Sequence, residues 1–98
     1  MERWRSDSTD TLCEAILSLK TREECYAFLA DVCTVREIQD LSQRLAVARL
    51  LHEKVSYNAI SRATGASTAT ISRVSKCCEY GAGGYGTVIA RLAGEEGK

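Results

Sequence analysis

Residues 67–76 gather side chains whose chemistry suits contact with a polyanion. Short hydroxyls and bases recur through the sequence STATISRVSK, and no carboxylate interrupts them. Hydroxyls and bases donate hydrogen bonds to phosphates, and an arginine can also bridge the edge of a guanine. We therefore take as candidates for contact with double-stranded DNA the polar residues of this stretch, namely Ser67, Thr68, Thr70, Ser72, Arg73, Ser75 and Lys76.

Two short helices joined by a glycine turn are expected to position these side chains. Ser56 can cap a helix that runs through Arg62, and Gly65 can take the positive φ of a tight turn. A second helix is expected from a cap at Ser67 to about Tyr80. Helices connected in this way form a helix-turn-helix, which we predict over residues 56–80.

The apolar residues of the same segment agree with this arrangement. Ile60 lies on the first helix and Ala66 in the turn, while Ile71 and Val74 stand three residues apart on the second helix. A set with this spacing can face inward and leave the polar residues outside. The agreement favours DNA binding over the alternative of an ordinary solvated helix, and it adds Ser56, Tyr57 and Arg62 to the candidates.

The net charge of zero conceals an uneven distribution of charge along the chain. The 98 residues contain 13 basic and 13 acidic side chains. Residues 1–33 hold four bases and seven acids, and residues 34–80 hold seven bases and four acids. Residues 54–78 hold four bases and no acid, so a nucleic acid is expected to bind there.

Three longer helices are expected before this segment. The cluster Asp7–Asp10 offers short oxygens that can cap a first helix, which continues to Lys20. Thr21–Glu24 and Thr34–Glu37 both have the form of a capping box, and they predict a second helix to Cys33 and a third to about Lys54. We expect a single helical domain over residues 1–98, with dimerisation helices at about 9–54 and a last helix at about 86–93.

The second of these helices predicts a homodimer. Residues 25–33 are apolar on nearly every side, and Asp31 is the only charged residue among them. A core of this size is marginal for one chain, so we expect a second copy to cover the apolar surface. A central helix buried within one chain is the alternative. The expected dimer interface consists of Leu12, Ile16, Phe28, Leu29 and Val32.

Several other classes of protein are excluded by the sequence. No apolar run is long enough to span a bilayer, and the start lacks the apolar segment of a signal peptide, so we expect a cytoplasmic protein without a membrane partner. The five cysteines include no CxxC pair, and adjacent Cys77 and Cys78 do not suit a zinc site, so no metal is expected. No nucleophile or carboxylate pair has catalytic spacing, so we do not expect an enzyme.

The segment ATGASTATISRVSKC resembles the helix-turn-helix of the Trp repressor superfamily. The stretch from REIQDLSQRLAVARLL through CEYGAGGYGTVIARL is similar to its YerC/YecD branch, and the resemblance covers about residues 10–93. It implies an all-α fold of six helices and an intertwined homodimer in which N-terminal helices cross between subunits. It also implies a bacterial DNA-binding regulator of transcription, and we expect a repressor.

The resemblance also implies a possible effector pocket at Arg44, Arg73, Val74 and Cys77. In the Trp repressor two arginines hold the indole of the corepressor. Arg73 matches one of them, and Arg44 matches the other if one residue is deleted before Ser56. Val74 stands at a glycine of the repressor and Cys77 at a serine that helps to hold the ligand carboxylate. Both changes weaken the pocket, so we expect no cofactor, and in particular not L-tryptophan. Either a smaller effector uses Arg44 and Arg73, or Val74 fills the gap and the motif is held ready without a ligand, and we favour the second.

Two functions from different classes follow from the sequence. The first is a dimeric regulator that reads a near-palindromic site, with half-sites about 34 Å or a multiple of it apart. The second is a helical protein-interaction module that keeps the fold without binding an operator. The zero net charge favours the second function, and the acid-free stretch around the helix-turn-helix favours the first.

Overall fold

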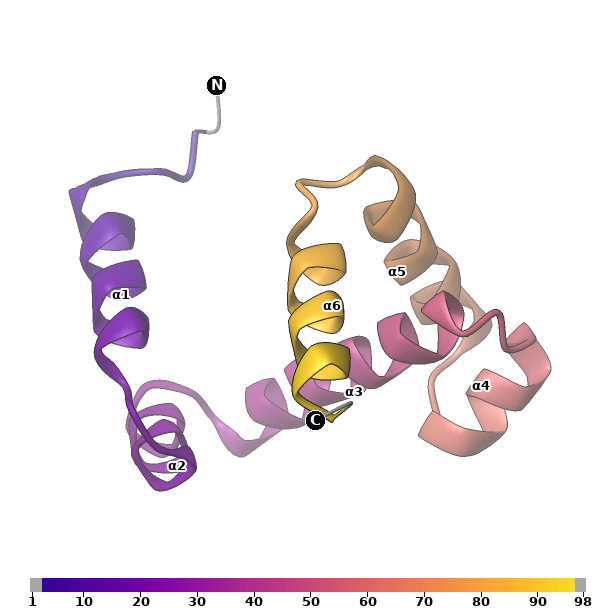
Figure 1. Ribbon diagram of the computed structural model, residues 1–98, viewed down its shortest axis with the longest axis horizontal. Coiled ribbons are helices and arrows are strands. Elements are labelled where there is room, and N and C mark those ends of the chain that lie inside the picture. Colours follow the sequence, from indigo (N-terminus) through magenta and orange to yellow (C-terminus); the bar gives the residue numbers. More distant parts are fainter. Residues whose placement is uncertain (1–2, 97–98) are drawn as a thin grey trace. The chain divides into compact units, whose positions relative to one another are not determined.

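The computed structural model describes residues 3–96, with side chains described to residue 94, and within this range the chain is entirely helical. Its six helices confirm the predicted all-α fold (Figure 1). The chain divides into two compact units, one up to Ile38 and one from Gln39 onward. The helices are α1 Asp7–Ser18, α2 Arg22–Val32, α3 Val35–His52, α4 Tyr57–Thr64, α5 Thr68–Tyr80 and α6 Gly84–Glu96.

The N-cap of helix α1 lies one residue before the cluster that was expected to cap it. The N-cap is Ser6, whose amide donates to the Thr9 hydroxyl at 2.7 Å, while the Thr9 amide donates to the Ser6 hydroxyl at 3.2 Å. Thr9 thus takes the place that glutamate or glutamine usually has in a capping box. The cluster Asp7–Asp10 was wrongly assigned as the cap, and its two carboxylates instead lie in the first turn, where they suit the helix dipole.

The two predicted threonine caps are confirmed. The Thr21 hydroxyl accepts from the Glu24 amide at 3.1 Å at the start of α2. At the start of α3, the Thr34 hydroxyl accepts from the Glu37 amide at 3.1 Å and the Glu37 carboxylate accepts from the Thr34 amide at 2.8 Å. Each pair satisfies backbone donors that a helix leaves unpaired at its start.

The end of α3 contains a strained residue. Lys54 has φ 63°, a left-handed conformation that usually belongs to glycine. The Lys54 amide donates to the Leu51 carbonyl at 2.9 Å, and the Val55 amide donates to the Leu50 carbonyl at 3.1 Å. This pair of bonds is the Schellman motif, and the accompanying apolar contacts are supplied by Leu50 and Val55, which both pack against the core.

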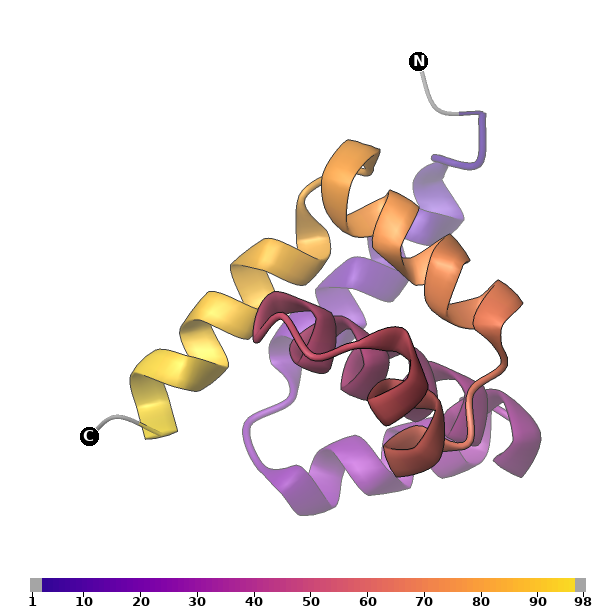
Figure 2. The ribbon, with the colours of Figure 1, turned by 90° about the vertical axis from the view of Figure 1, so that its right-hand side faces the viewer.

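The core lies entirely in the second unit, among the described side chains. Helices α1 and α2 contain no buried residue, whereas α3, α4, α5 and α6 all contribute to one apolar cluster. Figures 1 and 2 show α4, α5 and α6 beside the C-terminal part of α3. This cluster fixes the helix-turn-helix to α3 and α6. Its buried members are Val47, Ala48, Ile60, Ala66, Ile71, Val74 and Ile89.

Candidate nucleic-acid interface

The turn between α4 and α5 depends on Gly65. Its φ of 75° and ψ of 3° place it in the left-handed region, and its amide donates to the Ser61 carbonyl at 2.8 Å. A residue with a Cβ is strained in this conformation even where space is open. The glycine thus ends α4 and turns the chain toward α5, as the sequence predicted.

Side-chain hydrogen bonds hold this turn on both sides. The Thr64 hydroxyl donates to the Ile60 carbonyl at 2.7 Å and accepts from the Ala66 amide at 3.2 Å. The Ser61 hydroxyl donates to the Ala66 carbonyl at 2.8 Å. From α3, the Gln43 side-chain amide donates to the Thr64 carbonyl at 3.1 Å. These bonds satisfy polar groups that are partly buried, so the angle between the two helices is well determined.

Helix α5 starts at a serine cap and presents bases on its outer face. The Ser67 hydroxyl accepts from the Thr70 amide at 3.1 Å. Thr68, Arg73 and Lys76 are exposed, and no acidic residue lies in the first turn. An anion can therefore approach the first turn of α5 without repulsion from a neighbouring carboxylate.

Three polar residues of α5 are less exposed than their expected outward position implied. Thr70, Ser72 and Ser75 are half-buried. Thr70 lies one turn before the buried Val74, and Ser75 lies one turn after the buried Ile71, so both flank the core face of the helix. The fully exposed face of α5 therefore includes fewer of its polar residues than the sequence indicated.

A polar cleft lies between α4 and the start of α5. It encloses about 390 Å³ and is lined by Asn58, Ser61 and Arg62 of α4 together with Thr68 of α5. The sequence analysis named Arg62 and Thr68 but missed Asn58 and Ser61. Asn58 lies one turn before Arg62, and this spacing is the signal that could have identified it. Ser56 and Tyr57 are also exposed, at the start of α4.

Ala69 is a further exposed residue that the sequence analysis missed. It lies one turn before Arg73 on the outer face of α5. Its small methyl group permits close approach and can contact the methyl group of a thymine. Its helical spacing from Arg73 is the signal that could have identified it.

The residues of the possible effector pocket differ in their exposure. Val74 is 3% exposed and belongs to the core, while Arg44 is half-buried and Arg73 is exposed. Cys77 lines an apolar cavity of about 510 Å³ that also contacts Leu45, the glycine-rich segment 81–84, Tyr85 and Val88. The side chain of Val74 therefore lies in the packed interior.

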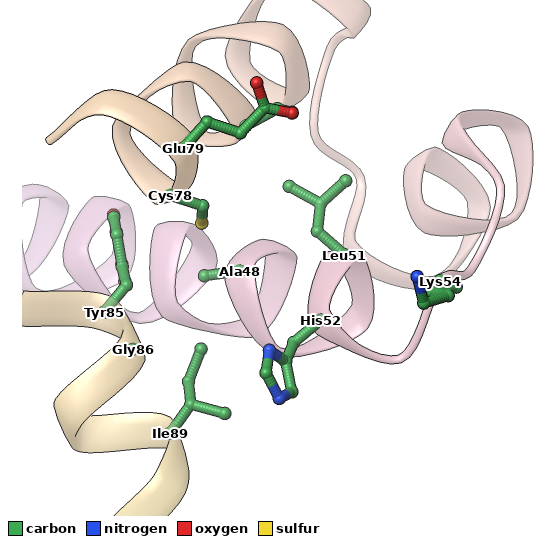
Figure 3. Close-up of a pocket in the computed structure, with 10 residues that line it drawn as sticks. Ala48, Leu51, His52, Lys54, Cys78, Glu79, Tyr85, Gly86 and Ile89 are labelled. Carbon is green, nitrogen blue, oxygen red and sulfur yellow. The ribbon is translucent and has the colours of Figure 1, made fainter. Parts of the chain in front are cut away.

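A second cavity, of about 380 Å³, is also lined by Tyr85. Figure 3 shows the Tyr85 ring rising from α6 toward α5, with Ala48 and Cys78 beside it, while the carboxylate of Glu79 points away. Burial, the neighbouring Cys77 and the Cys78 thiol raise the pKa of the Tyr85 phenol, and the guanidinium groups of Arg44 and Arg73 oppose this rise. Burial also raises the pKa of the Cys78 thiol, with smaller contributions from Cys77 and Glu79. The phenol and the thiol are therefore both neutral at pH 7.

Two further properties concern the part of the chain that the structure describes. None of its helices combines the length and the apolar character of a membrane span. No three histidine, cysteine or acidic side chains in it come together as metal ligands would.

The fold and its exposed face define an all-helical protein with a helix-turn-helix. Residues 7–93 match the sequence profile of the family described as Trp repressor protein. The chain belongs to the Trp repressor family, as its sequence indicated. It is 50% identical over 92 residues to the uncharacterized protein YerC of Bacillus subtilis strain 168. The matched residues make up 94% of this chain and 88% of YerC.

Two crystal structures share the fold. One is a Staphylococcus aureus protein provisionally described as a Trp repressor, with a TM-score of 0.88 and 47% identity over 91% of this chain and 89% of that one. The other is a TrpR-like protein from Eubacterium eligens ATCC 27750, with a TM-score of 0.88 and 49% identity over 91% of this chain and 92% of that one. The predicted Trp repressor-like fold is thereby confirmed.

Proposed function

We propose that this protein is a DNA-binding regulator of transcription that represses by occupying its operator. The observation that carries the proposal is the surface of α5 from Thr68 to Cys78, which contains no acidic residue and follows α4 through the Gly65 turn. Membership of the Trp repressor family supports the same conclusion. A helix presented in this way enters the major groove with its first turn directed at the bases.

The candidate residues divide into two roles by their position. At the start of α5, Ser67, Thr68 and Ala69 reach base edges, together with Thr70 and Ser72 on the flanks of the helix. Phosphates are contacted by the remaining polar groups, which fix the position of the protein on the duplex without reading its sequence. These groups are Ser56, Tyr57, Asn58, Ser61, Arg62, Arg73 and Lys76.

The functional form is a homodimer built through α1 and α2. Ile16 is 52% exposed and Val32 is 56% exposed, although both are apolar and lie on helices without a buried residue. Leu12 is exposed as well, and Phe28 and Leu29 are half-buried. A second copy would cover these side chains and would place two copies of α5 on a near-palindromic site, about 34 Å or a multiple of it apart.

No tryptophan is required in this proposal. Val74 fills the interior of the helix-turn-helix with its own side chain, so the motif is held ready without a ligand. A corepressor acts only by binding the competent state more tightly than the other state. The protein is therefore expected to bind its operator in the absence of any small molecule.

The test is selection of duplexes from a random-sequence pool, followed by affinity measurements at two salt concentrations. We expect one enriched near-palindromic site, and Thr68→Ala changes its preferred sequence. Lys76→Ala lowers the salt slope by about 1 per subunit, because one phosphate contact is lost. Lys20→Ala removes an exposed base far along the chain from α5 and serves as the matched control, with an unchanged slope.

The proposal fails if the parent protein enriches no sequence, or if the Thr68 and Lys76 variants both bind DNA as the parent does. In the first case the helical protein-interaction module is the better description.

A further inference from the structure

We propose that Tyr85 is a positioning residue for α5. Its ring packs between α5 and α3 and sets the distance between the C-terminal half of α5 and α3. The proposal deepens the proposed function, because α5 is the helix assigned to the DNA groove. It concerns a residue outside the helix-turn-helix that contacts no DNA itself.

The first observation is that Tyr85 borders two cavities. The cavity of about 380 Å³ touches Ala48 and Leu51 of α3 and Cys78 of α5. The cavity of about 510 Å³ touches Leu45 of α3 and Cys77 of α5. Among the described residues that line these cavities, Tyr85 is the one that both share.

The second observation is that the surroundings offer nothing to replace the ring. Residues 81–84 and 86 are glycines and one alanine, and a Cβ built on Gly84 or Gly86 would meet nothing within 4 Å. Tyr85 itself is half-buried and packs against the core cluster. Removal of the ring would therefore enlarge both cavities where they touch Cys77 and Cys78 of α5, and the larger space would leave this part of the helix free to shift.

The third observation connects the ring to the two arginines of the predicted pocket. Arg44 on α3 and Arg73 on α5 both act electrostatically on the Tyr85 phenol, so the phenol lies within range of both helices. Arg73 belongs to the outer face that is proposed to contact phosphate. A movement of α5 against α3 would therefore displace Arg73 directly.

The experiment removes the ring and then returns it as a free molecule. Tyr85→Ala is compared with the parent protein in DNA affinity, at a temperature at which circular dichroism shows both to be folded. Phenol, the part of the side chain that this substitution deletes, is added as the probe. We expect Tyr85→Ala to bind the selected duplex at least ~10-fold more weakly, saturating phenol to restore most of that loss, and the parent to be insensitive to phenol.

Two further variants separate positioning from general stability. Tyr85→Phe keeps the ring and is expected to stay within about 2-fold of the parent in DNA affinity. Leu50→Ala truncates another residue that packs against the core but lines neither cavity. It should lower the melting temperature as Tyr85→Ala does, while its folded form binds DNA as the parent does.

A readout without DNA keeps this inference separate from the proposed function. Amide hydrogen exchange of residues 71–78 should become faster in Tyr85→Ala and slow again with phenol, whether or not the parent binds DNA. The inference is overturned if phenol restores neither exchange protection nor affinity, or if Leu50→Ala loses as much affinity as Tyr85→Ala. It is also overturned if sedimentation shows Tyr85→Ala to be monomeric where the parent is a dimer, because the ring would then act at an interface.

Discussion

The Ser61 hydroxyl donates a hydrogen bond of 2.8 Å to the main-chain carbonyl of Ala66, and so joins the last turn of α4 to the residue before the cap of α5. Ser61→Ala removes this donor and leaves a partly buried carbonyl unpaired. We expect a loss of about 1–2 kcal/mol in the free energy of unfolding, measured by urea denaturation. Ser18→Ala is the control, because its hydroxyl donates to the Ala15 carbonyl on an exposed surface. Equal losses in the two variants would contradict this account.

A substitution at Gly65 should test the backbone alone. A Cβ at this position would meet no atom within 4 Å, so Gly65→Ala introduces no collision and acts only through its φ of +75°. We expect it to cost about 1–2 kcal/mol, and Gly65→Asn to cost less, because asparagine tolerates the left-handed region. Thermal denaturation of both variants measures the difference. An alanine variant as stable as the parent would show that the turn has another conformation.

A substitution at Lys54 should stabilise the protein, in contrast to the one at Gly65. Its left-handed φ of 63° is strained for a lysine, so Lys54→Gly is expected to raise the free energy of unfolding by up to about 1 kcal/mol. Glu53→Gly lies one residue earlier in the chain and should destabilise, since no positive φ is found there. A destabilised Lys54→Gly would mean that the lysine side chain contributes more than its backbone strain removes.

Stability should decline in alkaline solution. The pKa values of Cys78 and Tyr85 are raised in the folded protein, so above the ordinary thiol and phenol values, about 8.5 and 10, the unfolded chain loses these protons first. The folded state then binds more protons than the unfolded state, and the free energy of unfolding falls with rising pH. Urea denaturation between pH 7 and 11 measures this decline, which Cys78→Ser and Tyr85→Phe should each reduce. A decline that neither variant changes would place its cause elsewhere.

Free L-tryptophan should not act as a corepressor. Val74 occupies the interior with a side chain that is 3% exposed, and Cys77 offers a poorer hydrogen-bond partner than a serine hydroxyl. Overpacking costs about 1–3 kcal/mol and the lost hydrogen bond about 1 more, which together weaken binding roughly 10²-fold or more. Isothermal titration with millimolar tryptophan measures the affinity. A micromolar dissociation constant, with DNA affinity rising alongside it, would refute the expectation.

The helix-turn-helix could be predicted because its signals are local. Ser56, Gly65 and Ser67 lie where caps and a turn require their types, and the structure places all three in those roles. The length of the last helix was underestimated because it depends on tertiary packing and not on local signals. The sequence indicated about 86–93, but α6 begins at Gly84, since packing of Tyr85 and Ile89 against the core outweighs the poor helix propensity of the glycines.

Parts of the candidate site could not be predicted because they arise from tertiary contact. Ser61 becomes part of the site only because α4 brings it beside Thr68 of α5, whereas the spacing of Asn58 from Arg62 was a local signal. The half-buried state of Thr70 and Ser75 likewise follows from the neighbours of α5 rather than from its own composition. A pattern along one helix does not report which flank a second helix covers.

The position of the core also sets an order of events during synthesis. The ribosome makes α1 and α2 before Val47, the first buried residue of the chain, exists. Helices of 12 and 11 residues are marginal in water when isolated, so until later contacts form, they are held mainly by their serine and threonine caps. Each new chain therefore passes through an interval in which its N-terminal apolar side chains are accessible to chaperones and proteases, and the length of that interval is fixed by how soon those side chains are covered.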